Sequence, residues 1–135
     1  MNLQDVADEL RTALDTVPGL TVPAWGTKSS GLPAGLIGWP ESVEFTATYA
    51  RGKARIRDWP VVIVVSANNT RKAWETLSDF LTDQPGGVVA ALEGGTYTEA
   101  DFVHVSSADL VEGAKYDSKD VIAAILHCDI NGPGK

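Results

Sequence analysis

Residues 61–65 read Val-Val-Ile-Val-Val, an apolar run in which every side chain is branched at Cβ. Branched side chains favour extended backbone, because they lose rotamer freedom in a helix and pack well on a pleated surface. A strand with one face in water alternates apolar and polar residues, whereas this run is apolar at every position. Residues 54–67 are therefore predicted to form a central strand that is covered on both faces.

Pro60 lies directly before this run. Proline has no N–H to donate to a neighbouring strand, so within sheets it is confined to edges and bulges. We therefore expect a bulge or an edge position at Pro60.

Two segments have the apolar spacing of helices. Leu3, Val6, Leu10, Leu14 and Val17 recur every three or four residues and stop at a Pro-Gly pair. Residues 70–81 follow a capping Asn-Thr pair and carry a second stripe of this kind, and residues 88–92 are long enough for one or two further turns. These segments predict two or three helices.

The remaining apolar segments are predicted strands at residues 20–25, 36–39, 43–49, 102–111 and 121–130, with a hairpin connection through Gly113 and residues 115–119. Strands grouped before and after helices, without βαβ alternation, indicate an α+β fold. We expect a mainly antiparallel sheet with two or three helices packed on one face, in the order α-β-β-β-β-α-(α)-β-β. The length of 135 residues corresponds to one domain spanning residues 1–135.

The charge balance disfavours several classes of function. Eleven Lys and Arg against 18 Asp and Glu give a net charge of −7, the opposite of a typical nucleic-acid-binding domain. The longest apolar run, residues 121–126, is too short to cross a bilayer, and the first residues lack the pattern of a signal peptide. We therefore expect a soluble protein without membrane contact, made in a cytoplasm.

The inventory of reactive side chains is poor. Lys28-Ser29 lacks the glycines of a phosphate-binding loop, and His104 and His127 fall on separate predicted strands, too few to make a metal site. Cys128 adjoins His127, but neighbours on a strand point to opposite faces, so Cys128 is predicted to be a small buried apolar residue. We expect no catalytic residue, no cofactor and no metal, and therefore not an enzyme.

One charged pattern stands out. Arg51, Lys53, Arg55 and Arg57 occupy alternate positions, which on a strand places all four side chains on one face over about 20 Å. They are four of the 11 basic residues, so the rest of the chain carries −7 − 4 = −11. We call these four residues together with Tyr49 the cationic segment.

Three interpretations of the cationic segment remain open. It is a solvated arm whose charges protect a sheet edge from aggregation, an arm that docks on the acidic face of an identical neighbour, or a set of contacts to the phosphates of passing DNA. Trp25, Trp39 and Trp59 lie near it in the sequence, and aromatic residues are common at interfaces. For Trp39 and Trp59 we expect positions in the core of the domain.

The chain resembles the tail terminator proteins of long-tailed, non-contractile phages (siphoviruses), especially those that infect actinobacteria. Three groups of segments carry the resemblance: DVADEL at residues 5–10 with VPGL at 17–20; IGWP at 37–40 with FTATYARG at 45–52 and WPVVIV at 59–64; and YT at 97–98 with DFVHV at 101–105, AAI at 123–125 and the glycine-rich end. These are hydrophobic and turn patterns that cover most of the length.

The resemblance implies a single tail-terminator-like domain that assembles as a homo-oligomeric ring, a hexamer, on the tail tube. The ring stops addition of the major tail tube protein and then accepts the head–tail connector proteins, while DNA passes through it without specific binding. No cofactor is implied, and the location is the head-proximal end of the virion tail, after assembly in the host cytoplasm. Tyr49, Arg51, Lys53, Arg55 and Arg57 correspond to the hairpin region of the family, hypothetically an oligomer or tube interface. The alternatives are a head-closure or head–tail joining neck protein and, from a different class, a small ligand-binding or regulatory α+β domain.

Overall fold

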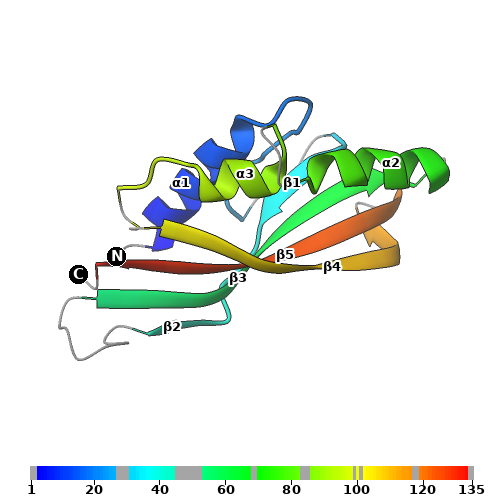
Figure 1. Cartoon of the computed structure of the whole chain (residues 1–135). Helices are drawn as coiled ribbons and strands as arrows, with labels where there is room; N and C mark the ends of the chain where they lie inside the picture. The colour runs from blue at the N-terminus through cyan, green and yellow to red at the C-terminus, as the bar shows by residue number, and fades with distance from the viewer. Residues whose placement is uncertain are drawn as a thin grey trace.

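A computed structural model describes residues 3–26, 31–44, 53–67, 70–82, 86–98, 100, 102–116 and 119–133. In chain order the elements are α1 (Leu3–Asp15), β1 (Ala34–Ile37), β2 (Ser42–Glu44), β3 (Lys53–Ser66), α2 (Thr70–Phe80), α3 (Val88–Glu93), β4 (Phe102–Tyr116) and β5 (Lys119–Pro133) (Figure 1). All strand pairings between these elements are antiparallel. The α+β class with an antiparallel sheet is therefore confirmed.

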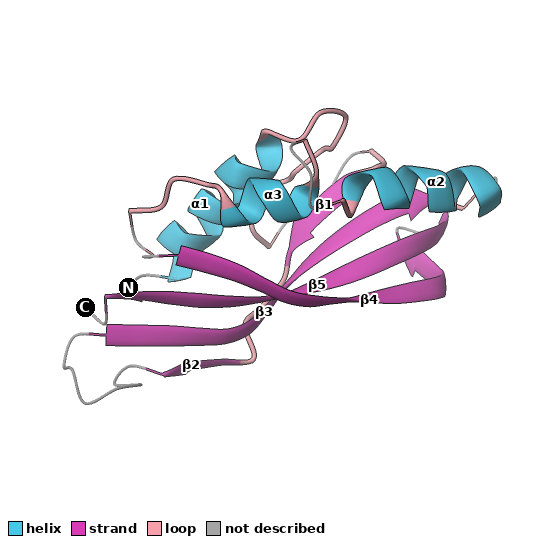
Figure 2. Cartoon of the chain, in the orientation of Figure 1, coloured by secondary structure: helices cyan, strands magenta, loops and turns pink. Residues whose placement is uncertain are grey.

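The strand order in the sheet is β1-β3-β5-β4, with β2 also paired to β3. Strand β3 is central, as its apolar run predicts. One side of β3 pairs with β5 along most of its length, and the other side is shared between β2, at Arg55–Arg57, and β1, at Val61–Val64. The β2 and β3 end of the sheet extends beyond the helices (Figure 2).

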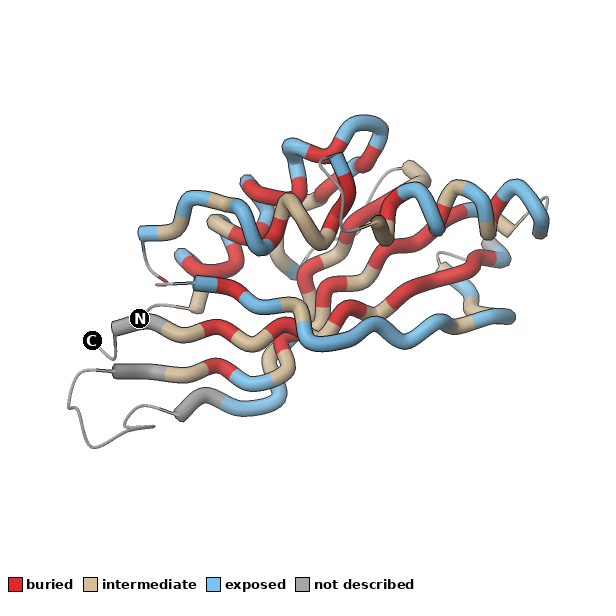
Figure 3. Tube along the Cα trace, viewed as in Figure 1, coloured by how far each residue is buried: buried red, intermediate tan, exposed pale blue. Residues whose placement is uncertain are grey.

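The three helices pack on one face of the sheet (Figure 2). Val61, Ile63 and Val65 of β3 are buried there against Leu10 of α1 and Leu77 of α2. Figure 3 shows the buried stretches on the helices and on the central strands that they cover. The predicted helical stripes therefore form the main core.

The face of the sheet opposite the helices, which we call the open face, carries a smaller apolar cluster. Its buried members are Val64, Val121 and Ala123, and partly buried side chains from β1 and β4 surround them. Val62, in the middle of the apolar run, is only half-buried. Both faces of β3 are thus apolar, but in the single chain the open face is covered by neighbouring side chains rather than by a second layer.

A β-bulge interrupts β3 between Ile56 and Trp59. Ile56 and Trp59 are both fully buried and pair with Ile130 and Cys128 of β5, so both point to the helix face. Three residues apart on a regular strand they would point to opposite faces. The extra residue of the bulge restores the pattern, and Asp58 within it has a left-handed φ of 50°.

Pro60 follows the bulge and lies where the pairing of β3 changes from β2 to β1. Its carbonyl accepts a hydrogen bond from the N–H of Gly38 at 2.8 Å, so the missing N–H faces the gap between β1 and β2. The bulge expected at Pro60 is therefore confirmed, and it lies two residues earlier, at Asp58.

Two local expectations are wrong. Residues 20–25 form only an isolated bridge, Thr21 to Ala34, because the hydrogen bonds of Thr21 to Pro33 and Gly35 do not continue along β1. Gly113 lies inside β4 rather than in the connection: its φ of 72° falls at a second bulge between Val111 and Ala114, and the strand continues to Tyr116. A glycine with positive φ is as typical of a bulge as of a turn.

Gly38→Ala tests the junction at Pro60. A Cβ at residue 38 would lie 2.8 Å from Cγ and 3.0 Å from the carbonyl oxygen of Pro60, so the backbone must shift. We expect a loss of about 1–3 kcal/mol in the free energy of unfolding, measured by urea denaturation. Gly31→Ala is the matched control, because its Cβ would meet no atom within 4 Å. Equal denaturation midpoints for the two variants would refute the close packing.

Candidate interaction surfaces

The structure describes the second half of the cationic segment. Tyr49 and Arg51 lie outside the described residues. Lys53 is the first residue of β3. Arg55 and Arg57 belong to the part of β3 that pairs with Glu44 and Ser42 of β2.

Arg55 and Arg57 lie on the open face, because Ile56 between them is buried on the helix side. The alternation predicted for these side chains therefore holds where it can be followed, and it ends at Asp58, where the bulge begins. Arg57 is exposed and Arg55 is half-buried. The Nε atom of Arg55 is buried without a hydrogen-bond partner in the described part of the chain, and such a group costs free energy until an acceptor reaches it.

Carboxylates follow the arginines on the open face. Asp58 on the bulge and Asp109 on β4 contact His127, and Asp129 on β5 accepts the N–H of Asp58. The side chain of Asp109 is 71% exposed. The open face therefore carries cations at its β2 end and carboxylates near its middle. Such a surface favours contact with a surface of the opposite arrangement.

The two histidines do not meet. His104 contacts Glu93 at the end of α3, with 3.1 Å between Nδ1 and Oε2. His127 contacts Asp58 through Nδ1 and Asp109 through Nε2, the latter at 2.8 Å. The two carboxylates sit on opposite sides of the ring and do not converge on one point. Among the described residues, no group of three or more His, Cys, Asp and Glu side chains is arranged to hold a metal ion.

Cys128 is buried on the helix face, as predicted. Burial raises the pKa of its thiol to about 12, and the neighbouring carboxylates of Asp129, Asp58 and Glu93 act in the same direction. The thiol is therefore protonated at neutral pH and unsuited to nucleophilic chemistry.

Three tryptophans form a chain from the core to the surface. The ring centroids of Trp59 and Trp25 are 5.8 Å apart, and those of Trp25 and Trp39 are 4.5 Å apart. The indole N–H groups of Trp59 and Trp25 both donate to the carbonyl of Gly38, at 2.7 and 2.9 Å. Trp59 is fully buried as predicted, but the prediction for Trp39 is wrong, since it is 69% exposed.

The exposure of Trp39 has a local cause. It lies two residues after the end of β1, in the connection to β2, so no strand carries it toward the helices. Its ring is held against Trp25 and therefore loses little conformational entropy on binding. A fixed, exposed tryptophan is a typical centre of a protein interface.

In the part of the chain that is described, β4 forms one edge of the sheet, and β2 and β1 share the opposite edge. The outer side of β1 has only the isolated bridge from Thr21 to Ala34. The carboxylate of Glu93 accepts the N–H of Val105 at 3.0 Å and so protects one position of the β4 edge. Farther along this edge Leu110 is 56% exposed. Unpaired strand edges can bond to another chain.

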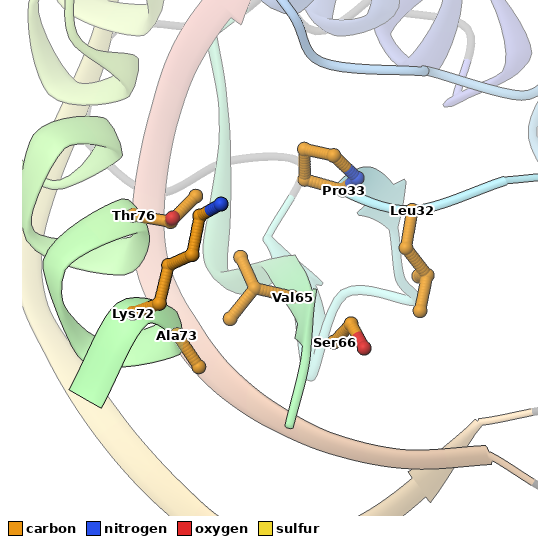
Figure 4. Close-up of a pocket in the computed structure, with 7 residues that line it drawn as sticks. All are labelled: Leu32, Pro33, Val65, Ser66, Lys72, Ala73 and Thr76. Carbon is orange, nitrogen blue, oxygen red and sulfur yellow. The ribbon is translucent and has the colours of Figure 1, made fainter. Parts of the chain in front are cut away.

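A pocket of about 230 Å³ lies between α2, β1 and the end of β3. Figure 4 shows Lys72 and Thr76 extending from α2, with Val65 and Ser66 beside them and Leu32 and Pro33 opposite. The pocket combines one ammonium and two hydroxyl groups with an apolar lining. These groups suit a small, mainly apolar ligand that has a hydrogen-bond acceptor at one end. The volume is below the roughly 300–1,000 Å³ of typical ligand sites.

The comparisons with known proteins add no relative. No protein-family model matches the sequence. No curated protein is significantly similar to it. None of the described helices is long and apolar enough to cross a membrane.

Sequence reasoning missed the exposure of Trp39, the edges of the described sheet and the carboxylates beside His127. Asp58 is 69 residues and Asp109 is 18 residues from His127, so no local motif joins them. The proline after Trp39 was the one available signal, because a proline at residue 40 indicates that the strand ends close to Trp39.

Trp39→Ala tests whether Trp39 contributes to the stability of the core. We expect it to change the free energy of unfolding by less than about 1 kcal/mol, as for other exposed positions. Trp59→Ala removes a fully buried side chain and should cost about 3–5 kcal/mol. Urea denaturation followed by circular dichroism measures both. A similar loss for the two variants would mean that Trp39 belongs to the folded core.

Proposed function

We propose that this protein is a structural component of a phage virion that assembles as a ring on the head-proximal end of the tail tube. In this role it stops addition of the tube protein and presents a docking surface for the head connector. The supporting observation is the separation of charge on the open face, with Arg55 and Arg57 at one end and Asp58, Asp109 and Asp129 beyond them. The resemblance in sequence supports the same role.

Charge separated in this way favours contact between unlike surfaces of identical chains. Such a head-to-tail contact repeats, and it closes into a ring when the rotation allows. The outer edges of β2 and β4 in the described sheet lie on opposite sides and suit the same repeating arrangement. A two-fold dimer would instead join one edge to itself.

The acidic remainder of the chain fits a ring through which DNA passes. Without the four cations of the cationic segment the chain carries −11, so a ring that engages these cations between subunits leaves mainly negative charge elsewhere. Like charge on the lumen would let DNA slide without binding. The proposed number of subunits is six, as the resemblance implies.

Two other functions remain as alternatives. A head-closure or head–tail joining protein of the same neck would use the same surfaces at the next step of assembly. A small ligand-binding or regulatory domain is favoured by the pocket near Lys72 and Thr76, although its volume of about 230 Å³ is small.

Reversal of charge tests the docking role of the cationic segment. We expect Arg55→Glu with Arg57→Glu to abolish rings, because the introduced carboxylates would repel the acidic face of the neighbour. Electron microscopy of particles assembled with tail tubes measures ring formation, and circular dichroism checks that the monomer is folded.

Arg71→Glu with Lys72→Glu is the matched control, because both residues are exposed on α2 and the change in net charge is the same. Rings formed by the β3 variant as efficiently as by this control would exclude the cationic segment as a docking arm.

Deletion of the gene in the source phage tests the function itself. We expect overlong tails without heads in the lysate, because nothing would stop tube growth. Electron microscopy measures tail length. Tails of normal length beside unattached heads would identify the joining step instead, and intact infectious particles would refute a structural role.

A further inference from the structure

The long strands of the sheet bend near their middle (Figure 1). His127 lies near the middle of β5. It pairs with Pro60 of β3 on one side and with Ser107 of β4 on the other. Both neighbouring strands have an irregularity there: the bulge before Trp59 in β3, and a register shift between Val105 and Ser107 in β4. The hydroxyl of Ser106 also donates to the carbonyl of His127 at 3.0 Å.

The imidazole of His127 joins three strands across the open face. Nδ1 contacts the carboxylate of Asp58 on β3, and Nε2 contacts the carboxylate of Asp109 on β4 at 2.8 Å. Asp58 is itself fixed, because its N–H donates to the carboxylate of Asp129 at 3.3 Å. The side chain of His127 is 25% exposed, so water reaches it only in part.

The chemistry of the contacts specifies the charged ring. Ionised carboxylates only accept hydrogen bonds, and a neutral imidazole has a single N–H. Both contacts can therefore be hydrogen bonds only when both ring nitrogens carry a proton. The hydrogen bond to Asp58, followed by that to Asp109, raises the pKa of His127 above its usual value of about 6.5, against a smaller opposing effect of burial.

Other charged groups lie near this bridge. On β3, Arg57 precedes Asp58, and the N–H of Glu41 before β2 donates to the carbonyl of Asp58. On β4, His104 pairs with Asp129 in register but uses its Nδ1 for Glu93. Asp129 adds a third carboxylate to the group. Loss of the proton from His127 therefore leaves Asp58 and Asp109 beside an uncharged ring, with Asp129 next to Asp58.

We propose that the bridge from Asp58 through His127 to Asp109 is a proton-dependent brace that fixes the bend of the sheet and holds the outer strand β4 in place. When both nitrogens are protonated, the imidazole of His127 on β5 connects β4 to the bulge of β3. Without the second proton, one of the two carboxylates loses its donor. Asp109 is the more exposed of the two, so it is released to water and the middle of β4 loosens.

The direction of the pH dependence follows from the raised pKa. The brace contributes its full stability below the pKa of histidine in the unfolded chain, about 6.5. The contribution is lost as the pH rises through the higher pKa of His127 in the folded chain. Strand β4 is therefore held below the raised pKa of His127 and loosens above it.

The test uses the whole chain as a monomer in solution, so its result does not depend on ring formation. NMR follows the protonation of both histidines from about pH 5 to 9, and hydrogen exchange, corrected for the intrinsic effect of pH, follows the amides of residues 107–111. We expect His127 to titrate above about 6.5 and exchange in β4 to rise through the same pH range, by about tenfold for each pH unit that separates the folded and unfolded pKa values.

Three variants locate the effect. His127→Gln should give rapid exchange in β4 at every pH, without a step, and Asp109→Asn should lower the pKa of His127 and move the step to lower pH. His104→Gln, which removes the other histidine of the described strands, should leave the step unchanged. Asp109 is exposed, so its variant keeps the test valid if His127→Gln does not fold.

The proposal fails if His127 titrates at or below about 6.5, or if exchange in β4 has no step in the parent chain. It also fails if the step persists in His127→Gln or disappears in His104→Gln.

Discussion

The bulge at Arg57 and Asp58 is the constraint on which the rest of the sheet depends. It lets Ile56 and Trp59 enter the same core although they are three residues apart, and it places Pro60 where no hydrogen-bond donor is needed. The same bulge ends the row of cations and turns Asp58 toward His127 on the open face. Packing on one face and charge on the other are thus set by one extra residue.

The two faces of the sheet serve different purposes. The helix face holds the main core, with Trp59 and the even-numbered residues of β5 from Ile122 to Ile130. The open face has a small apolar cluster at one end, carboxylates and a histidine in the middle and arginines at the other end. Such a face is too polar to be a second core. Its charges are also separated by sign, which is not typical of a surface that only contacts water. This is the physical basis for proposing that identical chains meet through it.

Much of the fold could be predicted because its signals are local. The Cβ-branched run of β3, the helical stripes of α1 and α2 and the approximate position of the bulge follow from residues close together in the sequence. The exposure of Trp39 and the continuation of β4 through Gly113 could not be predicted in this way. A tryptophan and a glycine each suit two environments, and the choice depends on which strand lies alongside.

The sequence by itself determined the class of fold, the central strand and the alternating cations that share one face, because side-chain periodicity follows directly from backbone geometry. Only the tertiary structure decided that the cationic row stops at Asp58, that β4 lies at an edge of the described sheet and that His127 lies between two carboxylates. These features join residues far apart in the chain. Which of these residues meet depends on the register between β3, β4 and β5, and a one-residue bulge changes that register.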